Sequence, residues 1–259
     1  MAKGGKNSNY QTEKRAAAAA ERRRIEKRKK RRKLLSAILI PTICVLLIVG
    51  SILGIIGKKN GWFRDPVEVT HYVTLIIAYD DAEGVKQSAE ITIELYGDEA
   101  PETVENFVAL CEEGYYDETV FHRIVEGFMV QGGDGDGNAD GISNDKPSIK
   151  GEFDENDYKN RIPHERGTIS MARSDDMDSA STQFFIVLET SENNTESLDG
   201  KYASFGKVIK GMSFFDMISK GVNDDIGGSY KFQGNRPTIL ATMVETPEEY
   251  AERMATVES

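Results

Sequence analysis

The stretch FHRIVEGFMVQGGD, residues 121–134, decides the fold. Short apolar runs lie on either side of Gly127, and two glycines follow the second run. Apolar runs bounded by glycines predict short strands joined by turns. Neighbouring residues of a regular strand point to opposite faces, so Phe128 and Met129 share one pocket only if the chain bends near Gly127. Taken alone, Arg123 would be an ordinary surface charge.

The region around this stretch, residues 67–246, alternates between strand-like runs and loops rich in Gly and Asp. Ala89–Tyr96 alternates apolar and polar residues, which predicts a half-buried strand. Further strands are expected at Tyr72–Tyr79, Val120–Ile124, Phe128–Gln131, Gly167–Met171, Phe184–Leu188, Ser204–Val208 and Thr238–Glu245. About eight strands without regular alternation with helices predict a mainly β fold, an antiparallel barrel with helices over its ends.

One helix is clearly punctuated. Pro101 suits the first helical turn, and Asp98 and Glu99 just ahead of it would complement the helix dipole. Gly114 ends the segment. One buried face is predicted from the helical spacing of four residues, namely Val104, Phe107, Val108 and Cys111. A second short helix is expected at Ser213–Lys220.

Charge divides the chain into a basic head and an acidic body. Residues 1–33 hold 14 Lys and Arg against 3 acidic residues, whereas residues 65–259 hold 15 against 40. Between them, Leu34–Ile56 is 23 residues long and carries no charge. As a helix it would span about 34 Å, against a hydrocarbon core of about 30 Å. We expect a transmembrane signal anchor at residues 34–57; a cleaved signal peptide is the main alternative, although its apolar region would be shorter.

The basic residues also predict an orientation. Arg22–Lys33 abuts one end of the span, which places the N-terminus in the cytoplasm and the acidic body outside. The same tract would contact anionic lipid headgroups. RNA or ribosome binding is the alternative, but the tract lacks interleaved aromatic residues, and we expect no nucleic-acid partner. The expected order is a cytoplasmic segment 1–33, the anchor 34–57, a linker 58–66, a globular domain 67–246 and an acidic tail 247–259, either a surface helix or disordered.

The quoted stretch resembles the central signature of the cyclophilin family. Further similarity lies, in the family's order, in the helix at Pro101–Cys111, in Gly167–Ala172 with Ser181–Ile186, and in Leu198–Tyr202 with Phe205–Val208. Together these blocks cover about residues 70–245. The resemblance implies a closed eight-stranded antiparallel β-barrel capped by two α-helices, and peptidylprolyl cis–trans isomerase activity on proline-containing polypeptides.

That activity requires only rotation about the amide bond that precedes proline. An X–Pro bond faces a rotation barrier of about 18–20 kcal/mol, and its uncatalysed exchange takes tens to hundreds of seconds. Acceleration by about 10⁵-fold requires lowering the barrier by roughly 7 kcal/mol. No bond is broken, so we expect no metal and no cofactor. A cation that bonds the prolyl nitrogen, an apolar pocket for the ring and groups that hold the flanking peptide would suffice.

The resemblance assigns these tasks to residues. Arg123 would be the cation, and Gln131 would orient it and bond the substrate carbonyl. The proline pocket would be formed by Phe128, Met129, Phe185 and Leu198. The cleft and its edge would be formed by His122 at the rim, Ala172, Arg173, Gln183 and Tyr202.

Departures from the family pattern bear on ligands. Ser197 stands where many members have Trp before Leu-Asp-Gly, which predicts weak cyclosporin binding. The acidic insert Ser174–Ser179 predicts a preference for basic residues near the substrate proline. Asp136–Gly141 imitates the first half of an EF-hand loop, but the twelfth position is Pro147, so we expect no calcium site.

Three hypotheses follow for the whole protein. The leading one is an anchored, extracytoplasmic isomerase that acts on exported or cell-surface proteins. The second is a non-catalytic module that holds proline-containing segments at the membrane. The third gives the basic head a cytoplasmic partner of its own.

Overall fold

The computed structural model describes residues 21, 23, 24, 26–31, 33, 51, 66–81, 84–135, 146–220, 222–226, 229–232 and 236–257. The chain divides into two units, residues 1–66 and 67–259. In the first unit, the residues described between 21 and 51 are helical and exposed. The expected anchor lies outside the described residues apart from Ser51, as does the segment Asp136–Gly141. Among the helices that are described, none is long and apolar enough to cross a membrane.

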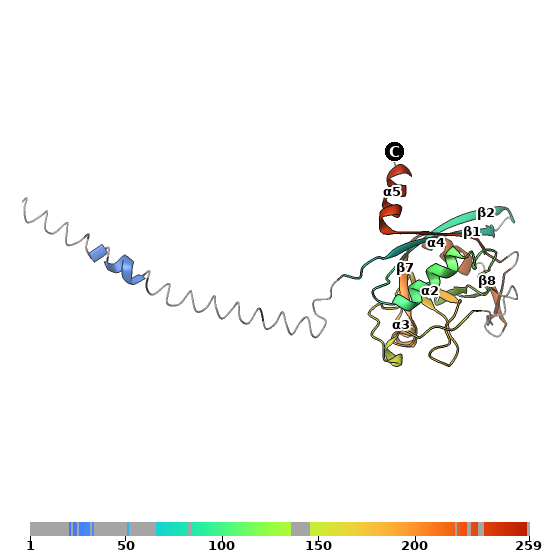
Figure 1. Cartoon of the computed structure of the whole chain (residues 1–259), viewed down its shortest axis with the longest axis horizontal. Coiled ribbons are helices and arrows are strands. Elements are labelled where there is room, and N and C mark those ends of the chain that lie inside the picture. The colour runs from blue at the N-terminus through green and yellow to red at the C-terminus, as the bar shows by residue number, and fades with distance from the viewer. Residues whose placement is uncertain are drawn as a thin grey trace, which may run out of the picture. The chain divides into compact units, whose positions relative to one another are not determined.

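The second unit is built on one antiparallel sheet of eight strands that curves into a half-barrel (Figure 1). The strand order is β10-β1-β2-β7-β5-β6-β4-β3. The strands are β1 (His71–Asp80), β2 (Lys86–Leu95), β3 (Arg123–Val125), β4 (Met129–Gly132), β5 (Thr168–Met171), β6 (Phe184–Val187), β7 (Ser204–Lys210) and β10 (Thr238–Glu245). A separate hairpin is formed by β8 (Val222–Ile226) and β9 (Ser229–Phe232). The prediction of a mainly β fold with eight antiparallel strands is confirmed.

The two ends of the strand order approach each other. The segment that leads into β3 forms a β-bridge to β10 between Val120 and Thr238. Backbone hydrogen bonds flank the bridge: Phe121 N donates to Pro237 O at 3.0 Å, and Ile239 N donates to Thr119 O at 2.8 Å. The edges of the sheet therefore exchange a few hydrogen bonds rather than a full ladder.

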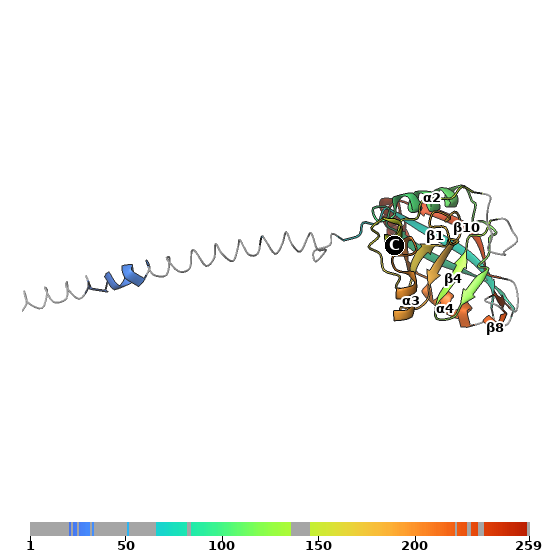
Figure 2. The ribbon, with the colours of Figure 1, turned by 90° about the horizontal axis from the view of Figure 1, so that it is seen from below.

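Two helices lie on opposite sides of the strands (Figure 2), namely α2 (Pro101–Glu112) and α4 (Met212–Lys220). The inner face of α2 buries Val104, Phe107 and Cys111, as the spacing predicts, whereas Leu110 is buried in place of Val108. Burial raises the pKa of the Cys111 thiol, which fits a core residue. Phe107 packs against aromatic rings contributed by the strands, so the helix closes one side of the core.

The N-terminus of α2 corrects one expectation. Its N-cap residue is Ala100, whose methyl group cannot accept a hydrogen bond. The buried carboxylate of Glu152 accepts hydrogen bonds from Thr103 N at 2.9 Å and Glu102 N at 3.2 Å. Glu99 instead pairs with Arg161. The charge that complements this helix dipole therefore comes from a loop about 50 residues away, because a side chain just ahead of Pro101 is directed elsewhere.

The C-terminal segment is a helix, α5 (Pro247–Val257), which follows β10 (Figure 1). Arg253 on α5 forms a two-pronged ion pair with Glu245, at 2.7 and 2.8 Å. The ring of Tyr250 stacks on Tyr72 of β1 with 4.0 Å between centroids. Of the two alternatives for the acidic tail, the structure shows a helix for residues 247–257.

Candidate active site

The alternation of side chains along β3, β4 and β6 builds the site on the outer face of the sheet. Ile124, Val130 and Ile186 point inward to the main core. Their neighbours point outward: Gln131 lies opposite Arg123 on one side and opposite Phe185 on the other. Directly opposed residues of antiparallel strands share a face, so three strands place these side chains together.

A turn at Gly127 resolves how Phe128 and Met129 share one pocket. Gly127 adopts a φ of +71°, in the left-handed region that glycine tolerates. Phe128 N donates to Val125 O at 3.0 Å, which closes the turn, and β4 begins only at Met129. Phe128 is therefore a turn residue, outside the strict alternation of the strand, and its ring covers the same hollow as the Met129 side chain.

The opposite wall comes from segments far along the chain. Ala172 follows β5, and its backbone N–H donates to Gln183 O at 2.9 Å. Leu198 is the last residue of the short helix α3 (Glu192–Leu198), and Tyr202 lies in the turn after it. The rings of Tyr202 and Phe185 pack edge to face, with 5.6 Å between their centroids.

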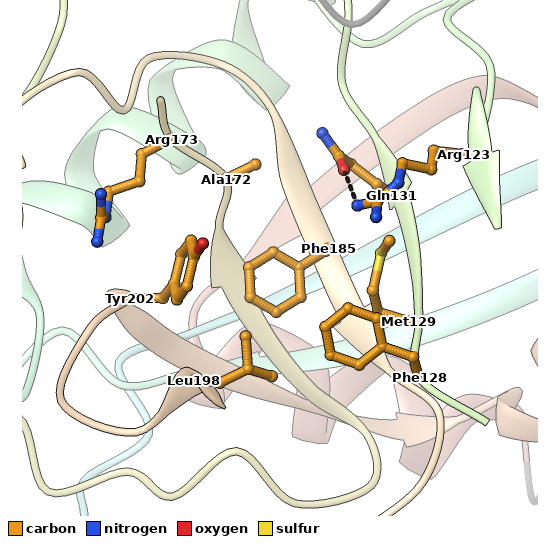
Figure 3. Close-up of a pocket in the computed structure, with 9 residues that line it drawn as sticks. All are labelled: Arg123, Phe128, Met129, Gln131, Ala172, Arg173, Phe185, Leu198 and Tyr202. Carbon is orange, nitrogen blue, oxygen red and sulfur yellow. Dashed lines mark hydrogen bonds between the residues drawn. The ribbon is translucent and has the colours of Figure 1, made fainter. Parts of the chain in front are cut away.

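These elements enclose one pocket of about 210 Å³ (Figure 3). The residues described as lining it are Arg123, Phe128, Met129, Gln131, Ala172, Arg173, Phe185, Leu198 and Tyr202. Nine of the eleven candidate site residues therefore meet around one hollow. The other two, His122 and Gln183, are not among the described lining residues. The side chain of His122 is buried, so the expected rim position is not observed. His122 directly precedes Arg123, whose side chain points outward, and it therefore faces the opposite way.

A hydrogen-bonded row crosses the polar end of the pocket. The guanidinium of Arg123 donates through Nη1 to Gln131 Oε1 at 3.3 Å (Figure 3). Gln131 Nε2 in turn donates to Gln183 Oε1 at 2.9 Å. Arg123 makes no ion pair with any residue that the structure describes. The cation is thus oriented by a neutral amide, and no carboxylate among the described residues is paired with it.

A buried histidine behind the pocket was not predicted from the sequence. The ring of His164 stacks on Phe185 with 6.0 Å between centroids. Its Nδ1 lies 2.8 Å from Asp199 Oδ1, and its Nε2 lies 3.0 Å from Ser170 Oγ. Because these partners are 35 and 6 residues away, no local spacing marks the group, although Asp199 directly follows the pocket residue Leu198.

The protonation state of His164 follows from its surroundings. Burial lowers the pKa of the imidazole, and the hydrogen bond to Asp199 only partly opposes this. The neutral ring donates from Nδ1 to the carboxylate, which can only accept, and Nε2 accepts from the Ser170 hydroxyl. The ring and its partner, the Ser170 hydroxyl, are both buried. The ring therefore packs behind Phe185, where substrate cannot reach it.

A second unpredicted residue links the two walls of the pocket. Asn194 of α3 is buried, and its Nδ2 donates to Gly127 O at 3.0 Å and to Glu189 O at 2.9 Å. The helix that presents Leu198 is therefore tied to the turn that presents Phe128. The adjacent Ser197 hydroxyl donates to Asn194 O at 2.9 Å and does not line the pocket.

Fold and site together define a class of protein: a curved antiparallel sheet with an apolar, ring-sized pocket on its outer face and a guanidinium, oriented by an amide, at the pocket's polar end. The profile of the cyclophilin type peptidyl-prolyl cis-trans isomerase/CLD family matches residues 83–244. The chain belongs to this family and is a peptidyl-prolyl cis–trans isomerase.

Individual relatives agree with this assignment. The chain is 38% identical over 160 residues to peptidyl-prolyl cis-trans isomerase A of Dickeya dadantii, covering 59% of this chain and 77% of that protein. It is 38% identical over 158 residues to peptidyl-prolyl cis-trans isomerase B of Escherichia coli, covering 60% of this chain and 92% of that protein. A Cryptosporidium parvum cyclophilin solved in the presence of the dipeptide Ala-Pro is similar in structure, with a TM-score of 0.53 and 25% identity over 68% of this chain and 99% of that chain.

Proposed function

We propose that this isomerase is anchored to a membrane and acts on X–Pro bonds of exported or cell-surface proteins, with Arg123 as the group that stabilises the twisted amide. The observation that carries the site assignment is the arrangement of Figure 3: Arg123 borders the same hollow as Phe128, Met129 and Phe185. A pyrrolidine ring fits a small apolar hollow of this kind, and the substrate amide would then lie at its polar end.

The role of Arg123 follows from what the amide loses on rotation. As the C–N bond twists, conjugation is lost and the nitrogen lone pair becomes a hydrogen-bond acceptor. A guanidinium donates to that lone pair only in the twisted state, so the interaction lowers the barrier without tightening ground-state binding. A charged hydrogen bond contributes about 1.5–3 kcal/mol, so Arg123 supplies a part of the roughly 7 kcal/mol required.

The remainder falls to the pocket and to Gln131. The apolar side chains hold the ring and favour the less polar twisted state. Gln131 Nε2 carries two hydrogens and donates one to Gln183, and the proposal assigns the other to the substrate carbonyl. Because Oε1 of the same amide accepts from Arg123, one side chain would fix both the cation and the substrate.

The anchored location rests on the sequence of the first unit. The uncharged run Leu34–Ile56 is long enough for one span, and the basic tract beside it favours a cytoplasmic N-terminus with residues 67–259 outside. Arg22–Lys33 would contact anionic lipid headgroups. Clients would then be proline-containing chains that emerge unfolded from export.

Two finer features belong to the same proposal. We infer that the bridge between Val120 and Thr238 closes the half-barrel into a complete barrel. Measurable protection from amide exchange at Ile239 N, which donates to Thr119 O, would support closure, and exchange as fast as in an open loop would argue against it.

Weak cyclosporin binding is expected because Ser197 offers no indole to the ligand; Ser197→Trp should strengthen inhibition.

The test of the function uses the full chain in detergent and a blocked proline tetrapeptide. NMR exchange between the cis and trans signals should be accelerated at catalytic amounts of protein. Binding of the peptide without added exchange would support the alternative, a proline-binding module without turnover, and would contradict the proposal.

A further inference from the structure

A second arginine, Arg173, borders the pocket on the other side of Phe185 from Arg123 (Figure 3). Its guanidinium lies over the ring of Tyr202, 4.8 Å from the centroid, and over the ring of Phe153, 5.1 Å from the centroid. Nε donates to Lys201 O at 2.9 Å, and Nη1 donates to Ser174 O at 2.8 Å and to Asp175 O at 3.5 Å. Two rings and three carbonyls therefore fix the position of this cation.

All of these contacts are to neutral groups. Arg173 forms no ion pair within the part of the chain that the structure describes. Among the described residues that line the pocket, Arg123 and Arg173 are the charged ones. The strongly acidic body of this protein therefore has a cationic binding site.

The neighbouring acidic insert is charged, but none of its carboxylates forms an ion pair with Arg173 among the described residues. Asp178 accepts hydrogen bonds from Gly151 N at 2.9 Å and Asn156 Nδ2 at 2.8 Å, and these bonds lower its pKa. Asp176 Oδ1 accepts from Asp178 N at 3.0 Å. Two of the three carboxylates are thus held in place by the loop while remaining exposed and charged, and Asp175 is the one nearest to Arg173 in sequence.

We infer that Arg173 makes the site select substrates that carry Asp or Glu next to the proline. This is the opposite of the preference expected from the composition of the insert, and it rests on the proposed use of the pocket for the proline ring. A peptide whose proline occupies the pocket must leave it on both sides; Arg123 borders one side, and Arg173 lies on the other side, beyond Tyr202 (Figure 3). Two opposite unit charges about 6 Å apart in a water-like medium shift an equilibrium by about threefold, so replacing an acidic by a basic neighbour shifts it by about tenfold.

The experiment compares three blocked peptides, Ac-Ala-Xaa-Pro-Xaa-NH₂ with Xaa as Glu, Gln or Lys, on the full chain in detergent. We expect kcat/KM, read from NMR exchange and divided by each uncatalysed rate, to be about tenfold higher for the Glu than for the Lys peptide at low salt. The ratio should shrink in about 0.5 M salt because exposed charges are screened.

Variants assign the preference to one side chain, and the Glu-to-Lys ratio is compared within each variant so that changes in overall rate cancel. Arg173→Gln should lower the ratio at least threefold, whereas Arg173→Lys should keep its direction. The matched control Asp175→Asn should leave the ratio unchanged or raise it. A parent ratio of one or less, or an unchanged ratio in Arg173→Gln, overturns the inference. If the Gln peptide itself is not accelerated, the proposed function fails instead.

Discussion

At the scale of single residues, the site depends on one cation that is oriented by its neighbour and on one imidazole that is kept neutral by burial. Arg123 is oriented by the amide of Gln131, and His164 is held neutral behind Phe185. The sequence could place Arg123, because it lies within a contiguous motif. It could not place His164, because a hydrogen bond to a residue 35 positions away leaves no local pattern.

The lowered pKa of His164 predicts a pH dependence of stability. The folded ring resists protonation, so below its ordinary pKa of 6.5 the unfolded chain binds a proton more readily and folding weakens as the pH falls. Thermal unfolding of the parent should therefore lose more stability between pH 7 and 5 than unfolding of His164→Gln. At pH 7.5 the variant should be less stable by about 1–3 kcal/mol, because buried hydrogen bonds are lost. Parallel pH profiles for the two proteins would contradict this account.

At the scale of elements, strands and helices differ in how well the sequence predicts them. Thr238–Glu245 is predicted with the observed bounds of β10, and the long periodic helix is predicted to within one residue of α2. The short helix α3 was not predicted, because its Asn, Thr and Ser residues have weak helix propensity. Its N-cap, Ser191, and tertiary hydrogen bonds made by Asn194 stabilise it instead.

The link between α3 and the Gly127 turn can be tested by removing one amide. Asn194→Ala would leave two backbone carbonyls without their donor and should cost about 1–3 kcal/mol of stability. Because the link joins both walls of the pocket, kcat/KM for a proline peptide should also fall severalfold. The matched control is Asn193→Ala, an exposed neighbour, which should stay within about 0.5 kcal/mol of the parent. Equal effects of the two substitutions would refute the role given to Asn194.

At the scale of the whole molecule, two units with opposite charge follow one another in the chain. The structure divides them after Pro66. For the first unit, the sequence evidence is charge and hydropathy alone, which predict a membrane span but no tertiary contact. For the second unit, the sequence evidence is the alternation of apolar and polar residues and the family motifs. These predict where the strands lie, but they do not predict which distant groups a loop residue such as Glu152 will bond.

The anchored topology predicts a fractionation result. The full chain should remain with membranes after alkaline extraction, whereas a chain lacking residues 1–57 should be soluble and keep its turnover. In intact cells, added protease should digest residues 67–259 and spare a tag at the N-terminus. Soluble behaviour of the full chain, or protection of the second unit from protease, would contradict the proposed location but would not bear on the activity.

The most direct test of the central claim separates binding from turnover at Arg123. The full chain, Arg123→Ala and Arg123→Lys are compared by NMR exchange for kcat and by titration for the Kd of one proline peptide. Because the guanidinium is proposed to bond the prolyl nitrogen only in the twisted amide, Arg123→Ala should lower kcat about 10- to 100-fold with Kd changed less than about threefold. Arg123→Lys should fall in between. An unchanged kcat in Arg123→Ala, or a Kd that rises by the whole factor, would contradict the account.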